Sequence, residues 1–137
     1  MKLKVCGMKL ENNISEISKL NPDFMGFIFW PKSKRFFNEK SIRISNKINK
    51  VGVFVNQDYD FIIDKINNFK LDFVQLHGEE DYQFCKKIKT QCKLIKVFNI
   101  GSDFDFEILN SFESVCDYFL FDTKGYSYGG NGIKFDW

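Results

Sequence analysis

Four side chains that could transfer protons or bind an anion lie at or just beyond the ends of short apolar runs: Cys6, Arg35, His77 and Asp122. A thiol and a carboxyl group that face one another can act as a base and acid pair, once the thiol has lost its proton and the carboxyl has kept one. The guanidinium of Arg35 is a planar fork that suits a carboxylate or a phosphate. These residue types suit proton transfer on an anionic substrate.

Each of these residues also fits a purely structural role. Free cysteine is among the most buried residue types, so Cys6 on its own is more typical of packing than of chemistry. Arg35 equally fits a solvated loop charge, and His77 fits a capping or core histidine. Asp122 fits a loop cap that binds backbone amides. The individual positions leave both interpretations open.

A glycine-rich segment near the end of the chain adds a candidate anion site at Gly129, Gly130, Asn131 and Gly132. Consecutive glycines let backbone amides approach an anion closely. The same composition is also typical of a flexible loop, so the segment by itself is a weak phosphate signal.

Apolar runs that read as strands alternate with stretches of helical spacing along the whole chain. The run 24–29 has no polar residue, which is the pattern of a strand buried on both faces. Strand starts recur about every 21 to 27 residues, the rhythm of βα units in a parallel sheet. Strands are predicted at 2–6, 24–29, 51–55, 73–76, 94–98 and 118–121, and helices near 14–20, 39–48, 58–69, 79–88 and 104–112.

The fold class that follows is α/β, with about six parallel βα units in one domain over residues 1–137. Short units without an extra domain favour a (βα) barrel over a doubly wound sheet, and no G-x-G-x-x-G or Walker sequence follows any strand. Barrel enzymes place their active sites at the carboxyl ends of the strands. A barrel would therefore bring the four dispersed side chains to one mouth.

Charge and cysteine content exclude several functional classes. The 20 basic and 18 acidic residues are mixed along the chain, so no block of like charge predicts binding to nucleic acid or to a membrane surface. No apolar stretch reads as a signal peptide or a membrane span, which predicts a cytoplasmic protein. The four cysteines match no zinc pattern, and Cys85 and Cys116 read as packing residues.

Taken together, the motifs resemble one family in order and spacing along the whole chain. That family is phosphoribosylanthranilate isomerase. The matching segments are Lys4–Met8, Gly26–Phe29, Pro31–Arg35, Val51–Asn56, Val74–Gly78, Phe121–Lys124, Gly129–Gly132 and Phe135–Trp137.

The resemblance implies a (βα)8 TIM barrel that performs an Amadori rearrangement in tryptophan biosynthesis. The substrate would be N-(5-phosphoribosyl)anthranilate, and the reaction would need neither a metal nor an organic cofactor. By the same resemblance Cys6 is the general base, Asp122 the general acid and Arg35 the ligand of the anthranilate carboxylate. His77 would contact the substrate, and Gly129–Gly132 would help to bind its phosphate. A different sugar-phosphate barrel enzyme fits the Cys6 and Asp122 pair less well.

Two departures from the family pattern produce further expectations. Asn131 stands where the family usually has threonine, a change that backbone binding of phosphate would tolerate. The seventh and eighth βα units are absent from the sequence, so the chain reads as a truncated barrel. We expect it to be weakly active, or a silent half-barrel, unless a second copy or a complementing C-terminal segment joins it.

Overall fold

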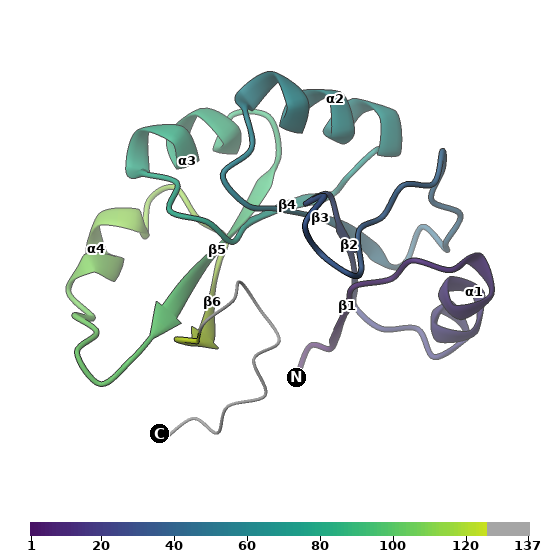
Figure 1. Ribbon diagram of the computed structural model, residues 1–137, viewed down its shortest axis with the longest axis horizontal. Helices are drawn as coiled ribbons and strands as arrows, with labels where there is room; N and C mark the ends of the chain where they lie inside the picture. The colour runs from purple at the N-terminus through teal and green to yellow at the C-terminus, as the bar shows by residue number, and fades with distance from the viewer. Residues whose placement is uncertain (126–137) are drawn as a thin grey trace.

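A computed structural model describes residues 1–125 as a single sheet with helices on its outer side (Figure 1). All neighbouring strands are parallel, and their order in the sheet is their order in the sequence. The strands are β1 (Lys4–Cys6), β2 (Phe24–Ile28), β3 (Asn49–Phe54), β4 (Phe73–Leu76), β5 (Lys93–Ile100) and β6 (Tyr118–Thr123). The helices are α1 (Glu11–Lys19), α2 (Tyr59–Phe69), α3 (Tyr82–Lys89) and α4 (Ile108–Phe112).

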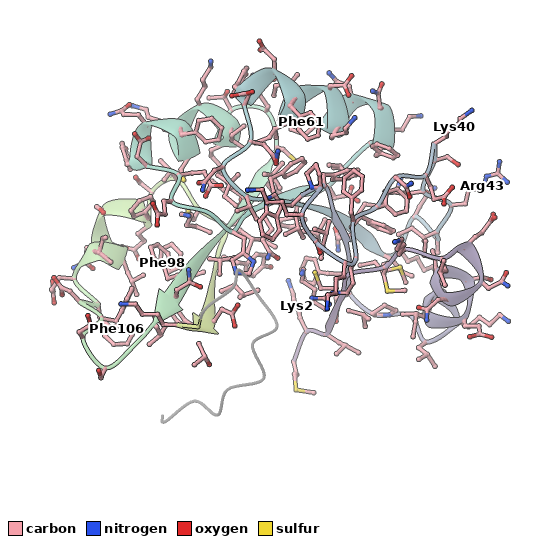
Figure 2. The ribbon with its side chains drawn as sticks, in the orientation of Figure 1. Lys2, Lys40, Arg43, Phe61, Phe98 and Phe106 are labelled. Atoms are coloured by element: carbon pink, nitrogen blue, oxygen red, sulfur yellow. The ribbon has the colours of Figure 1, made fainter. Side chains whose placement is uncertain are left out.

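The sequential strand order confirms the half-barrel predicted from the βα rhythm. A doubly wound sheet would reverse its strand order at one point, whereas here the sheet winds in one direction and curves into an arc. The curvature is strong enough for residues at the two outermost strands to meet. Lys2 Nζ donates a hydrogen bond of 2.6 Å to the hydroxyl of Tyr118, and Lys2 lies at the open side of the arc in Figure 2.

Side chains alternate between the two faces of the sheet, as the pleat requires. Met25 and Phe27 of β2 belong to the large outer core between sheet and helices, where Phe27 contacts Phe37. Phe98 of β5 packs against α4 in the same layer, as Figure 2 shows. A smaller cluster fills the concave face below the strand ends, formed by Phe24, Val51, Phe73, Ile95 and Leu120. Apolar packing thus covers both faces, and polar side chains on the concave face are exceptions that need a reason.

The helix predicted near 39–48 is wrong. The segment between β2 and β3 contains no helix, and only isolated turns interrupt its extended course. Ile42 and Ile44 are half-buried against the outer core while their neighbours are exposed. Core contacts at every second residue require an extended chain, because a helix would turn residues two apart to different faces.

The helix predicted over 104–112 is much shorter in the structure, where α4 begins only at Ile108. The carboxylate of Asp105 accepts a hydrogen bond of 3.0 Å from the backbone N–H of Glu107. Such a local bond offers the backbone an alternative to the helix, which is why aspartate favours turns. Phe104 still reaches the core, where its ring packs edge-on against Phe98.

Candidate active site

Four residues that the sequence singled out lie around one pocket on the concave face of the sheet. The pocket has a volume of about 210 Å³ and opens at the carboxyl ends of the strands. It is lined by Lys4, Cys6, Ile28, Trp30, Ser33, Arg35, Val53, Val55, Gln75, His77, Leu120 and Asp122. The fold therefore brings Cys6, Arg35, His77 and Asp122 together from positions more than a hundred residues apart in sequence.

Cys6 is the last residue of β1, and the turn that follows it is fastened to the neighbouring strand. The backbone N–H groups of Gly7 and Met8 both donate to the carbonyl of Gly26 at 3.0 Å. Gly26 also makes room for the thiol, because a Cβ at that position would lie 2.6 Å from Cys6 Sγ. The thiol is thus held half-buried in the pocket wall between β1 and β2.

Arg35 reaches the pocket from the loop after β2. Its guanidinium lies against Gly7, whose φ of +84° is a conformation that glycine adopts without strain. Arg35 Nη1 donates a long hydrogen bond of 3.3 Å to the carbonyl of Cys6. The side chain is otherwise exposed, so its remaining donors can bind an anion in the pocket. Lys32, in the same loop, does not line the pocket.

His77 and Asp122 face one another across the pocket floor. His77 Nε2 lies 3.3 Å from Asp122 Oδ2, but the groups are not aligned for a hydrogen bond, and Nε2 is buried without a hydrogen-bond partner among residues 1–125. The other carboxylate oxygen of Asp122 accepts from the backbone N–H of Thr123 at 2.9 Å. Asp122 thus accepts a hydrogen bond from a backbone amide, as a loop cap would, and its second carboxylate oxygen still faces the pocket.

The environment of His77 favours its neutral form. Burial lowers the pKa of His77 below its ordinary value, and the nearby carboxylate of Asp122 opposes this shift without reversing it. Cys85, Cys92 and Cys116 lie outside the pocket. Burial raises the pKa of Cys85 to about 12 and the pKa values of Cys92 and Cys116 to about 11, which keeps these three thiols protonated at neutral pH.

The lowered pKa of His77 predicts how stability changes with pH. The unfolded chain, with an imidazole pKa near 6.5, takes up a proton before the folded chain does as the pH falls. The stabilisation is therefore complete above pH 6.5 and is lost as the pH drops below it. Urea unfolding at pH 7.5 and pH 5.5 measures the loss, and we expect a smaller loss in His77→Gln. Equal losses in the two proteins would contradict the shift.

Gln75 and Lys4 are polar pocket residues that the sequence did not identify as site candidates. Gln75 is 3% exposed, and its Oε1 has no hydrogen-bond partner within the described part of the chain. Lys4 lies beside Cys6, since a Cβ on Gly26 would be 3.1 Å from Lys4 Nζ. The two-residue period of a strand could have identified both residues. Lys4 precedes Cys6 by two residues and Gln75 precedes His77 by two residues, so each shares a face of the sheet with a predicted site residue. Gly129, Gly130, Asn131 and Gly132 lie outside the described residues.

The chain matches one known protein family along nearly its whole length. The family model described as N-(5'phosphoribosyl)anthranilate (PRA) isomerase matches residues 3–137. The chain belongs to this family. The isomerase fold and the family resemblance predicted from the sequence are thereby confirmed, and the predicted function is confirmed at the level of the family.

Curated relatives and solved structures agree with the family model. The N-(5'-phosphoribosyl)anthranilate isomerase of Phocaeicola vulgatus is 41% identical over 138 residues, covering 100% of this chain and 67% of the relative. The isomerase of Parabacteroides distasonis is 42% identical over 144 residues, covering 100% of this chain and 65% of the relative. This chain thus spans about two thirds of the length of these isomerases.

The crystal structure of phosphoribosyl anthranilate isomerase from Thermotoga maritima superposes with a TM-score of 0.87 at 34% identity, covering 100% of this chain and 68% of that one. A second isomerase structure is a complex with reduced 1-(o-carboxyphenylamino)-1-deoxyribulose 5-phosphate, with a TM-score of 0.80 at 31% identity. The match covers 90% of this chain and 66% of the chain in that complex.

Within residues 1–125, no helix is long and apolar enough to cross a membrane.

Proposed function

We propose that this chain carries the acid and base of a phosphoribosylanthranilate isomerase site and catalyses the Amadori rearrangement of N-(5-phosphoribosyl)anthranilate. The observation that supports the proposal most directly is the placement of Cys6 and Asp122 in one pocket, from the first and the last strand of the arc. An acid and a base on different strands can flank a sugar and act on separate atoms of it.

In the proposed reaction, Asp122 gives its proton to the ring oxygen of the ribose. The bond from that oxygen to C1 breaks, and the lone pair of the anthranilate nitrogen forms the C1 iminium. Cys6, as the thiolate, then takes the proton from C2, and the released electron pair forms the C1–C2 double bond of an enolamine. The enolamine then takes up a proton from water at C1 and releases the hydroxyl proton of C2 to water, which gives the ketone of 1-(2-carboxyphenylamino)-1-deoxyribulose 5-phosphate. Transfer of one proton from the Cys6 thiol to Asp122 through water restores the acid and the base. No atom is gained or lost overall.

Other residues of the pocket would bind the substrate. Arg35 would hold the anthranilate carboxylate through the donors that Cys6 does not use. His77, whose Nε2 is buried without a hydrogen-bond partner within residues 1–125, would contact the sugar beside Asp122. Gly129–Gly132 would contribute to phosphate binding. The substrate is thus a small molecule with an anionic group at each end.

Association with another chain belongs to the same proposal. One solved relative from Thermotoga maritima is described as a dimeric isomerase from which monomers were generated. A second copy, or a segment equivalent to the C-terminal third of the relatives, is the partner that we propose. Nucleic acid and membranes are not among the proposed partners.

Turnover of phosphoribosylanthranilate, followed by its fluorescence, tests the proposed function. The chain is assayed alone, with the C-terminal third of the Phocaeicola vulgatus isomerase added as a separate polypeptide, and with that third fused to it. We expect turnover in the fused form and weaker turnover in the other two. Absence of turnover from all three forms, if each is folded by circular dichroism, would contradict the proposal.

The fork of Arg35 predicts a specific binding defect. Arg35→Lys keeps the charge but loses the second parallel donor, so a carboxylate bound by two hydrogen bonds loses one. We expect KM to rise about tenfold with a smaller change in kcat. Lys32→Met is the matched control, because Lys32 is a cation of the same loop outside the pocket. An equal rise of KM in both variants would contradict the assignment.

A further inference from the structure

A buried ion pair lies directly behind the wall of the pocket. Lys96 of β5 points away from the concave face, and its Nζ lies 3.0 Å from Glu80 Oε2. The two side chains are 5% and 4% exposed, so both charges are removed from water. Burying a lysine and a glutamate is costly even when they are paired, so a gain in stability does not by itself account for the pair. The mechanism proposed above uses neither residue.

The pair is built into the turn that carries His77. Lys96 Nζ donates a hydrogen bond of 2.7 Å to the carbonyl of Gly78, and Gly78 N–H donates to Glu80 Oε2 at 3.0 Å. Glu80 Oε1 accepts from the backbone N–H of Asn56 at 2.9 Å. These bonds join the end of β3, the end of β4 and the middle of β5. They fix the backbone at the residue that immediately follows His77.

The side chain of Asn56 completes this connection from the other side. Its Oδ1 accepts a hydrogen bond of 2.8 Å from the backbone N–H of Glu79. It also packs so tightly against Gly78 that a Cβ there would collide with it. The turn after β4 is therefore held by side chains from two elements, which leaves His77 little freedom to move along the strand.

The charges of the pair also act on the imidazole. His77 is faced by Asp122 from β6, by Lys96 from β5 and by Glu80 from its own turn, and Lys4, Cys6 and Arg35 line the same pocket. Lys96 acts to lower the pKa of His77, whereas Glu80 and Asp122 act to raise it. Burial has the largest effect and lowers the pKa. Because Lys96 partly offsets two carboxylates, its removal would favour the imidazolium.

A neutral imidazole matters for the proposed chemistry. An imidazolium beside Asp122 would stabilise the carboxylate and so disfavour the protonated acid that ring opening needs. We propose that Lys96 and Glu80 are positioning residues of the isomerase site, which hold the turn after β4 and so place His77 beside Asp122. Lys96 also opposes protonation of the imidazole, whereas Glu80 favours it. This inference rests on the proposed function for its catalytic consequence, but its electrostatic part concerns the folded chain alone.

The chain offers a clean experiment, because His77 is its only histidine. Proton NMR of the single imidazole gives its titration midpoint in the folded chain, with or without turnover. We expect Glu80→Gln to move the midpoint to lower pH and Lys96→Met to move it to higher pH. The double variant Lys96→Met/Glu80→Gln, which leaves no unpaired buried charge, is expected to fall between the two single variants. It also keeps the test open if Lys96→Met does not fold.

Lys89→Met is the matched control, because it breaks the partly exposed ion pair between Lys89 and Asp117, and neither residue lines the pocket that holds His77. Its midpoint should equal that of the wild type. A wild-type midpoint in folded Glu80→Gln, or equal midpoints in folded Glu80→Gln and the folded double variant, would overturn the inference, as would equal shifts in Lys89→Met.

Activity provides the second readout. In the fused form, the double variant should lower kcat about 10- to 100-fold with a smaller rise of KM, because the turn that places His77 beside the acid Asp122 loses its support. It should also displace the pH profile of kcat in the direction in which the imidazole midpoint moves. Shifted midpoints with an unchanged pH profile would overturn the catalytic part alone, whereas absence of turnover in the wild type would instead contradict the proposed function.

Discussion

Replacing either Cys6 or Asp122 should reduce turnover by about 10²- to 10⁴-fold, the usual contribution of a positioned acid or base. Cys6→Ser leaves a hydroxyl that is a far weaker base, and Asp122→Asn leaves a side chain of the same size that cannot deliver a carboxyl proton. Both residues line the pocket, so kcat should fall far more than KM rises. Steady-state turnover in the fused form of the chain measures both constants.

Matched controls exist for both substitutions. Cys92→Ser changes a half-buried thiol outside the pocket. The Cys92 thiol donates a hydrogen bond to the carbonyl of Leu71, and a serine hydroxyl can donate the same bond. Asp117→Asn changes a carboxylate that pairs with Lys89 instead of facing the pocket. Both controls should keep kcat within about a factor of two of the wild type. Wild-type rates in Cys6→Ser and Asp122→Asn would show that the assigned mechanism is wrong.

The largest expected effect on stability is at Lys96. Lys96→Met leaves Glu80 as a buried carboxylate without its cation, a change that lowers the free energy of unfolding by about 3–5 kcal/mol. Lys89→Met breaks an ion pair that retains contact with water, so we expect a loss of at most about 1 kcal/mol. Urea unfolding followed by circular dichroism compares the two variants at one pH.

The double variant Lys96→Met/Glu80→Gln separates the cost of an unpaired charge from the cost of lost packing. It should recover a large part of the stability lost in Lys96→Met, because no ionised group is left buried. Similar losses in Lys96→Met and Lys89→Met, or no recovery in the double variant, would indicate that the buried pair is not what holds the turn after β4.

The local sequence pattern predicted the secondary structure correctly where one requirement, such as burial on both faces, dominates a segment. The apolar run of β2 is buried at all five positions, as expected for a strand covered on both faces. The helix predicted at 39–48 was wrong, because half-buried Ile42 and Ile44 alternate with exposed residues, which indicates an extended chain. Two neighbouring carboxylates before α3 have different roles in the structure. Asp81 caps α3 through Phe84 N–H, whereas Glu80 turns inward to Lys96 and does not serve the helix start.

The sequence by itself determined the parallel βα order and placed Cys6, Arg35, His77 and Asp122 at strand ends, because burial on both faces and the period of the repeats are local properties of the chain. Only the tertiary structure decided which of these groups meet. The approach of His77 to Asp122 at 3.3 Å depends on the curvature of the sheet. The pairing of Lys96 with Glu80 depends on how α3 and its preceding turn pack behind β5. Contacts of this kind join residues far apart in sequence, and no local pattern encodes them.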